Sequence, residues 1–156
     1  MAAINRNQRR RWFRRRFDLP VGAGVIAASP IPKGRVIHSW KGATVVARPT
    51  YQSVQIGRHR HVHDPACLNL LNHSCDPNVR IDIPRRTVVA RRAIAPGELL
   101  TFFYPATEWE MARPFRCRCG TPSCIGRVSG AGDLGRRVLR GRGLSRHIRD
   151  LLRSRR

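Results

Sequence analysis

Apolar and polar residues alternate over short distances along the middle of this chain. Residues 79–83 read Val-Arg-Ile-Asp-Ile, with an apolar side chain at every second position. A period of two places alternate side chains on opposite faces of a strand, and therefore predicts a strand with one buried face. The apolar run at 87–92 predicts its partner strand, because the Pro-Arg-Arg sequence between the two runs is typical of a turn.

Further short strands are predicted wherever turn residues bracket an apolar run. Pro-Gly, Lys-Gly and Ser-Pro pairs interrupt the chain repeatedly between residues 29 and 97. Many short strands with few helices are typical of a mainly β fold built from several small sheets. The other strands predicted in this way are 24–28, 35–40, 44–47 and 98–104.

Two segments depart from the strand pattern. Residues 66–71 are apolar and predict one turn of helix or a short connector. Near the C-terminus, Leu144, Ile148, Leu151 and Leu152 recur at helical spacing among arginines. We expect this helix to pack its apolar stripe on the domain. The alternative is a basic amphipathic helix that docks on an acidic surface.

The composition is ordinary for a globular protein except for the sign of its charge. Hydrophobic residues make up 41% of the 156 residues, but 31 basic residues outnumber 9 acidic ones and give a net charge of +22. Residues 1–17 carry +7 and residues 127–156 carry +8. We interpret these terminal segments as basic arms that bind an acidic partner, with nucleic acid as the candidate.

Several classes of protein are excluded by the remaining composition. No apolar stretch approaches the roughly 20 residues of a membrane span. Five cysteines, an odd number, argue against a disulfide scaffold and favour an intracellular protein. The apolar stretch 21–28 is too short and too rich in glycine for a secretory signal. We therefore expect a cytoplasmic location, with the nucleus or the nucleoid as alternatives.

Three cysteines close together indicate a metal site. Cys117, Cys119 and Cys124 have the spacing C-x-C-x4-C, with glycine and proline between them. Tight turns of this kind bring thiolates within reach of one Zn²⁺, which takes four ligands in a structural site. The fourth ligand is missing locally, and the remaining cysteines are Cys67 and Cys75. The alternative is that all are free thiols.

Histidines alternate in the segment before the 66–71 turn. If His59, His61 and His63 lie on a strand, all three share one face. We interpret this face as surface or as part of a substrate groove. A second metal site that includes Asp64 or Cys67 is the alternative, although we expect Cys67 to be a buried small hydrophobe.

Polar residues crowd together directly after the 66–71 turn. Residues 72–78 read Asn-His-Ser-Cys-Asp-Pro-Asn, and the Asn and His side chains offer both donors and acceptors to a ligand. This motif and the cysteine cluster together resemble the SET-domain protein-lysine methyltransferases that carry a post-SET zinc segment. Four stretches occur in the family's order, which are Val-Gly-Ala-Gly-Val at 21–25, the motif at 72–78, Pro-Gly-Glu-Leu-Leu-Thr-Phe-Phe-Tyr at 96–104 and Phe-x-Cys-x-Cys-Gly-x3-Cys-x-Gly at 115–126.

The resemblance covers roughly residues 18–128 and implies an architecture. The fold would be the SET β-fold, in which small sheets surround a pseudoknot-like crossing formed by the segment 72–78. The implied domains are a basic arm at 1–17, the SET domain at 18–114, the post-SET zinc segment at 115–128 and a basic tail with a short amphipathic helix at 129–156.

The resemblance also implies two bound groups. S-adenosylmethionine would lie against the backbone of Gly22, Ala23 and Gly24. Asn72 and His73 would hold its amino acid and adenine parts, and an apolar residue of the family beside the adenine corresponds to Phe115. Zn²⁺ would bind the cysteines, with Cys75 as the fourth ligand beside Cys117, Cys119 and Cys124.

The catalytic tyrosine of the family corresponds to Tyr104. Its hydroxyl would orient the lysine amine, although without the resemblance this residue would be interpreted as a core aromatic. Phe103 stands where the family usually has Asp. Phe102 occupies the position at which Phe or Tyr influences the number of methyl groups, and Phe there predicts di- or trimethylation. Tyr51, the other tyrosine, has no assigned place.

The implied function is S-adenosylmethionine-dependent methylation of a lysine in a protein substrate. The alternative is a zinc-stabilised nucleic-acid-binding protein with an inactive SET-like domain. The substrate and the oligomeric state are not specified by the sequence. The acids of the matched region that are available to attract a lysine are Asp64, Asp76, Asp82, Glu98, Glu108 and Glu110.

Overall fold

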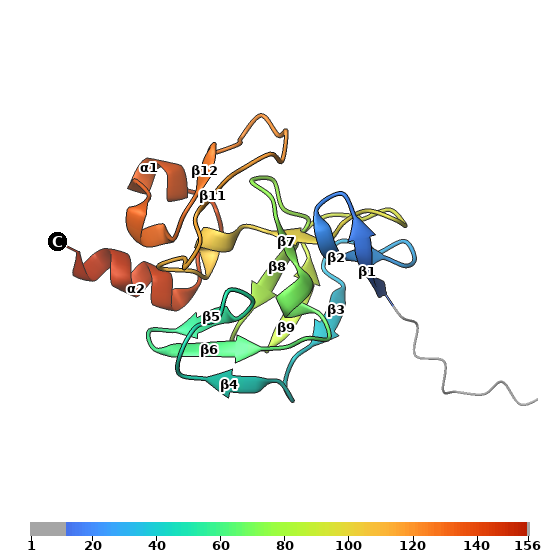
Figure 1. Cartoon of the computed structure of the whole chain (residues 1–156), viewed down its shortest axis with the longest axis horizontal. Helices are drawn as coiled ribbons and strands as arrows, with labels where there is room; N and C mark the ends of the chain where they lie inside the picture. Colours follow the sequence, from blue (N-terminus) through green and yellow to red (C-terminus); the bar gives the residue numbers. More distant parts are fainter. Residues whose placement is uncertain (1–11, 156) are drawn as a thin grey trace, which may run out of the picture.

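The computed structural model describes residues 12–155, in which short strands predominate (Figure 1). Strands β1 (Phe13–Leu19) and β2 (Gly22–Ala27) pair antiparallel at one end of the molecule. Residues 13–17, expected to belong to a basic arm, therefore form part of the folded body. The remainder of that arm, residues 1–11, lies outside the described residues.

A three-stranded antiparallel sheet contains the hairpin predicted from the alternating pattern. Its strand order is β3-β9-β8, and Val79 pairs with Ala90. Val79 is buried whereas Arg80 is exposed, as the period of two requires. The strands of this sheet are β3 (Val36–Ser39), β8 (Val79–Asp82) and β9 (Thr87–Ala90).

A second three-stranded antiparallel sheet has the order β4-β6-β5. Its strands are β4 (Thr44–Val46), β5 (Val54–Gly57), which the sequence pattern did not predict, and β6 (Arg60–His63). The histidines of this region do not behave as one surface face, because His61 is buried and His63 hydrogen-bonds Asn69 at 2.8 Å. Within residues 12–155 they belong to no cluster of metal-ligating side chains, and a second metal site there is not supported.

The chain crosses itself where two short strands run parallel. Strand β7 (Asn72–His73) pairs with β10 (Thr101–Phe102). Buried Asn78 fixes this crossing, because its Nδ2 donates to the carbonyl of Leu99 at 2.8 Å and its Oδ1 accepts from the amide of Thr101 at 2.9 Å. The predicted strand at 98–104 is therefore much shorter than expected, since a side chain takes up backbone groups that a neighbouring strand would otherwise bind.

Single turns of 3-10 helix stand on either side of the crossing. The apolar segment 66–71 contains η1 (Leu68–Leu70), and η2 (Tyr104–Ala106) follows β10 directly. Cys67 precedes η1 and is fully buried in the main core, which confirms it as a small hydrophobe. This main core lies between the sheets and includes Val25, Ile31, Val62, Leu68, Val79, Val88, Ile94 and Leu100.

The C-terminal part packs on a second, smaller core. In Figure 1 its elements lie together on the side away from β1. Ile148 is fully buried there and Leu144 and Leu152 pack beside it, which confirms that the amphipathic helix packs on the domain. Within residues 12–155 no helix is long and apolar enough to cross a membrane. The elements of this part are β11 (Phe115–Arg116), β12 (Arg127–Val128), η3 (Ala131–Asp133), α1 (Arg136–Leu139) and α2 (Arg146–Ser154).

Candidate active site and metal centre

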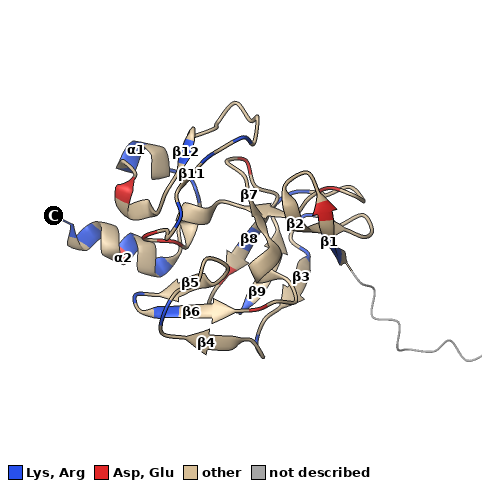
Figure 2. Ribbon diagram, viewed as in Figure 1, with Lys and Arg blue, Asp and Glu red and all other residues tan. Residues whose placement is uncertain are grey.

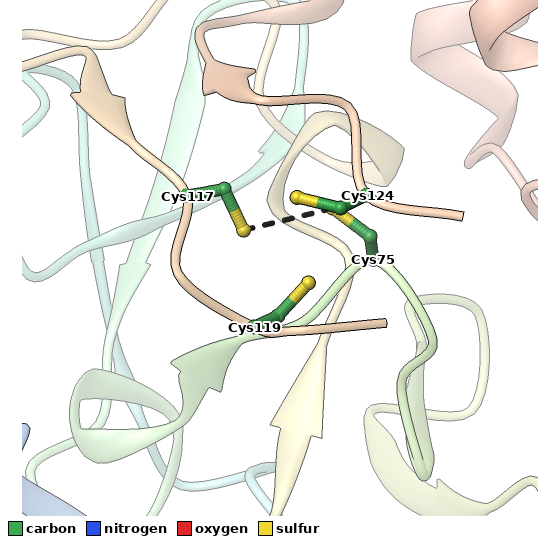
Figure 3. A group of neighbouring side chains, drawn as sticks. All are labelled: Cys75, Cys117, Cys119 and Cys124. Atoms are coloured by element: carbon green, nitrogen blue, oxygen red, sulfur yellow. Dashed lines mark hydrogen bonds between the residues drawn. The ribbon is translucent and has the colours of Figure 1, made fainter. Parts of the chain in front are cut away.

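Four cysteines from distant parts of the sequence converge on one point (Figure 3). Cys75 follows β7, whereas Cys117, Cys119 and Cys124 lie between β11 and β12. Their Sγ atoms all lie within 4.8 Å of one another, and those of Cys75 and Cys117 are 3.7 Å apart. The fifth cysteine, Cys67, lies elsewhere in the main core.

The geometry of this cluster fits a tetrahedral metal ion. A Zn–S bond of about 2.3 Å places two sulfurs of a tetrahedron about 3.8 Å apart. The amide of Ile125 donates to Cys75 Sγ and the amide of Gly126 donates to Cys124 Sγ, both at 3.4 Å. Burial raises the pKa of Cys75 and that of Cys117, the latter to about 12, whereas hydrogen bonds that involve Thr121 outweigh burial at Cys119 and lower its pKa to about 6. Such hydrogen bonds favour the thiolates that a metal binds.

His73 connects the cysteine cluster with Tyr104. Its Nδ1 accepts a hydrogen bond from the backbone amide of Tyr104 at 3.2 Å, and its Nε2 lies 3.3 Å from Cys75 Sγ. An amide can only donate, so neutral His73 carries its proton on Nε2 and donates it to the sulfur. Burial lowers the pKa of His73 to about 4, which keeps the ring neutral. Both ring nitrogens are thus occupied within the protein.

Tyr104 stands at the crossing with its hydroxyl held in place. The hydroxyl donates to the backbone carbonyl of Leu71 at 2.8 Å. The ring packs 4.8 Å from the ring of Phe102 and meets the ring of His73 edge-on at 5.2 Å. Burial, and then the nearby charge of Glu108, raise the pKa of Tyr104 above its ordinary value, so the group is a neutral phenol.

The glycine-rich start of the domain reaches this region through Asn72. Nδ2 of Asn72 donates to the carbonyl of Ala23 at 2.9 Å. A Cβ at Gly24 would lie 2.8 Å from the side chains of Leu19 and Leu99. The lack of a side chain at Gly24 therefore permits close packing within the protein. Gly22 has a positive φ of 89° and open space where a side chain would stand.

Phe115 brings the segment 115–128 to the same place. Its ring lies 5.9 Å from the ring of His73 and 6.1 Å from that of Tyr104, both edge-on. The side chain remains 37% exposed, which leaves an apolar surface free for contact. The fold therefore joins Ala23, Asn72, His73, Tyr104 and Phe115 in one continuous series of contacts.

A cavity of about 360 Å³ opens on one side of Tyr104. Leu71 and Phe102 contribute apolar wall, and Tyr51 lies at its rim, where Arg113 stacks over the Tyr51 ring at 5.7 Å. Phe102 also lines a second cavity of about 450 Å³, between β8 and the segment that leads into α2. The unassigned second tyrosine is thus brought close to Tyr104, which no sequence motif indicated.

The six acids of the matched region separate into distinct groups. Asp64 pairs with His38 at 2.8 Å, Asp82 with Arg80 at 3.1 Å and Glu98 with Arg92 at 2.9 Å, while Asp76 is exposed. Glu108 and Glu110 both line the cavity beside Tyr104. No described residue forms an ion pair with either of them.

Residues beyond the motifs hold this site together. The backbone amide of buried Gln55 donates to Glu108 Oε1 at 2.8 Å. The side-chain Oε1 of Gln55 accepts from the backbone amide of Trp109, also at 2.8 Å. Arg142 donates to the carbonyls of Cys75 and Ser123 and stacks over the ring of Phe103. These contacts tie β5 and the C-terminal segment to the site. Neither residue is part of a recognisable motif, so sequence reasoning missed both.

Comparison with known proteins identifies relatives of this arrangement. The family model of the SET domain matches residues 22–105. The methyltransferase flvH of Aspergillus flavus is 36% identical over 85% of this chain and 76% of its own length. The histone-lysine N-methyltransferase ash1 of Drosophila melanogaster is 30% identical over 70% of this chain, but the match spans only 6% of that protein.

A solved structure shares the fold at low sequence identity. KRYPTONITE in complex with mCHH DNA, an H3(1-15) peptide and SAH matches with a TM-score of 0.54 and 21% identity. The match covers 74% of this chain and 29% of that one. At this identity the similarity establishes the arrangement of strands, while the chemistry depends on the residues themselves.

Proposed function

The chain belongs to the SET-domain family, and we propose that it transfers methyl groups from S-adenosylmethionine to a lysine side chain of a protein substrate. The observation that carries this proposal is the meeting of Tyr104, His73 and Phe115 around the crossing of β7 and β10. Each comes from a different motif, and each motif has its counterpart in the family.

We propose that S-adenosylmethionine, which supplies the methyl group as a sulfonium, lies beside Asn72, His73 and Phe115. Oδ1 of Asn72 takes no part in the hydrogen bonds that fix its Nδ2, and it can accept from an ammonium group. The exposed face of Phe115 suits an adenine ring. The exposed backbone at Gly22 and Ala23 would complete the site, whereas Gly24 would contribute through packing.

We propose that the four cysteines bind one Zn²⁺ as a structural ion. The sulfur positions support this proposal, and so does the His73 proton directed at Cys75. The ion would fasten the segment 115–128 to the loop after β7. It would thereby hold Phe115 against the site.

The lysine would enter through the cavity that contains Tyr104. A lysine amine attacks only when neutral, and its ordinary pKa is about 10.4. The apolar walls at Leu71 and Phe102 disfavour the charged form. The neutral hydroxyl of Tyr104 would hold the amine in line with the methyl group, so that alignment supplies much of the acceleration.

Transfer of labelled methyl groups tests the function directly. With labelled S-adenosylmethionine and a protein lysate, we expect the chain to label a protein, and acid hydrolysis to release methylated lysine. Absence of transfer, together with tight nucleic-acid binding that weakens steeply with salt, would favour the alternative of an inactive SET-like domain.

Phe102 is expected to permit more than one methyl group. It carries no hydroxyl, and its ring borders the cavity of Tyr104 on one side and the second cavity on the other. Mass spectrometry of the product should show di- or trimethyl-lysine. The Phe102→Tyr variant should shift the product towards monomethyl-lysine, because an added hydroxyl in the cavity of Tyr104 would take up room that a methylated amine needs. Only monomethyl-lysine from the wild type would contradict this prediction.

Nucleic acid remains a second candidate partner. The C-terminal elements expose many arginines with few acids among them (Figure 2). Such a surface attracts phosphate, and it would place the enzyme near DNA-bound or RNA-bound substrates in a nucleus or nucleoid. The exposed arginines of this surface are Arg136, Arg137, Arg140, Arg146, Arg149, Arg153 and Arg155.

A further inference from the structure

Glu108 is a carboxylate without a cation in a protein that has an excess of cations. It lines the cavity that contains Tyr104, and its backbone amide donates to the carbonyl of Tyr104 at 3.0 Å. Its Oε1 accepts from the amide of Gln55 at 2.8 Å and from the hydroxyl of Thr107 at 3.1 Å. Its Oε2 has no hydrogen-bond or ion-pair partner within residues 12–155.

The lack of a partner is costly. Glu108 is partly buried and its Oε2 still reaches solvent, but a carboxylate that loses part of its solvation and gains no cation recovers little of it. Burial raises the pKa of Glu108 to about 7. The chain has 31 basic residues, and both buried Asp82 and partly buried Glu98 obtain an arginine. A cation that comes and goes with the substrate would explain why this position has none.

We propose that Glu108 pairs with the ammonium group of the substrate lysine and accepts its proton before methyl transfer. The inference rests on the proposed function. It assigns to this site a base that the sequence motifs do not contain.

The reaction consists of two balanced steps, a proton transfer from the ammonium group to Glu108 and then a substitution at the methyl carbon. The N–H bond of the ammonium breaks, its electron pair stays on nitrogen, and the proton binds a carboxylate oxygen of Glu108. The nitrogen lone pair then forms the bond to the methyl carbon as the bond from that carbon to sulfur breaks. The positive charge moves from sulfur to nitrogen, and Glu108 returns its proton to water through the mouth of the cavity.

The other titratable groups near the cavity are poorly placed to act as this base. The hydroxyl of Tyr104 donates to Leu71, and burial raises its pKa. His73 is held by Cys75 and the amide of Tyr104. Arg113 is a permanent cation at the rim, and Glu110 is exposed. His147, which binds the carbonyl of Thr107 behind Glu108, has its pKa lowered by burial and is neutral above pH 7.

The pH dependence of methyl transfer by Glu108→Gln tests the assignment. The amide keeps the size and the acceptor oxygen of Glu108, so the bonds from Gln55 and Thr107 can persist. For the wild type, kcat/KM on the labelled lysate protein should rise to a plateau with a midpoint near pH 7. The variant must bind amine that is already neutral, so its kcat/KM should rise about tenfold per pH unit towards the lysine pKa of about 10.4.

The loss of kcat/KM that Glu108→Gln causes therefore depends on pH. Near neutral pH the variant should be slower by about 10²-fold or more, and the two enzymes should converge at high pH. Glu110→Gln is the matched control, because it removes an exposed acid from the same cavity. We expect it to raise KM and to leave the shape of the pH profile unchanged.

Stability provides a second readout, which tests the raised pKa of Glu108 on which the pH profile depends. Folding raises the pKa of Glu108, so the ionised carboxylate destabilises the folded state, and this penalty grows as pH rises from the ordinary value of 4.5 to about 7. Glu108→Gln should therefore melt at a higher temperature than the wild type above pH 7. Near pH 4 the two melting temperatures should agree.

The outcomes separate this inference from the proposed function. A variant whose kcat/KM falls equally at every pH, or does not fall, overturns the role of Glu108 while methylation by the wild type stands. A wild type that transfers no methyl group overturns both. A variant that is more stable above pH 7 and is selectively inactive near neutral pH supports the assignment.

Discussion

The Tyr104→Phe variant is expected to lose methyl transfer by about 10²–10³-fold in kcat, with binding of S-adenosylmethionine little changed. The substitution removes only the hydroxyl that donates to the Leu71 carbonyl at 2.8 Å. Phe102 and His73 still pack against the ring, so its position should persist. The loss therefore measures how far the hydroxyl orients the amine and the methyl group, which is a contribution made in the transition state.

Steady-state kinetics and calorimetry separate the effect of Tyr104→Phe on kcat from its effect on the binding of S-adenosylmethionine. Labelled S-adenosylmethionine gives kcat and KM, and a binding titration with the same compound reports the cofactor site. Tyr51→Phe is the matched control, since it removes the other tyrosine hydroxyl of the cavity from an exposed rim position. Its effect should appear in KM, with kcat within about threefold. Retention of more than one tenth of kcat by Tyr104→Phe would refute a catalytic role for the hydroxyl.

Removal of the metal is expected to have the second large effect. We expect metal analysis to find about one Zn per chain, and Cys75→Ser to abolish that metal. Cys75 is the one cysteine of this cluster outside the segment 117–124, so its replacement should detach that segment from the loop after β7. Structural zinc contributes folding energy directly, and the melting temperature should fall by about 10 °C or more.

Loss of the metal should also reduce activity. Phe115 lies two residues before Cys117 and would lose its place beside His73 and Tyr104. Cys67→Ala is the control, because it removes a buried thiol of the main core that is not part of the cluster. That variant should keep its full metal content, even if it is less stable. A wild type that is free of metal, well folded and active would contradict the zinc assignment.

The local pattern predicted parts of this fold well. The hairpin of β8 and β9 follows from alternating residues and a turn sequence, which are properties of neighbouring residues. Strand β5 was missed and the strand at 98–104 was overestimated. The shortening of the strand at 98–104 depends on a partner far along the chain, since Asn78 takes up backbone groups at Leu99 and Thr101. Strand β5, in contrast, pairs with the adjacent strand β6 as a local hairpin that the pattern did not single out.

The structure also changes the interpretation of the positive charge at the two ends of the chain. Arginines at both ends suggested two arms, but the described part of the C-terminal segment buries Ile148 and Leu139 in a core of its own. Arg142 then binds the carbonyls of Cys75 and Ser123. An arginine count does not distinguish an arm from a folded surface, because the distinction depends on the few apolar residues between the charges.

The sequence by itself determined which residue types carry the chemistry. The order of its motifs, through their resemblance to the SET-domain family, indicated Tyr104, the Asn-His pair and the four cysteines as candidates, although Cys75 lies 42 positions before Cys117. Only the tertiary structure decided which acids line the cavity that contains Tyr104. Asp82 pairs with arginines two and three residues away in the sequence, whereas Glu108 has no such neighbour and lines the cavity of Tyr104. The type of an ionisable side chain follows from the sequence, but its burial and the cavity that it lines depend on the whole fold.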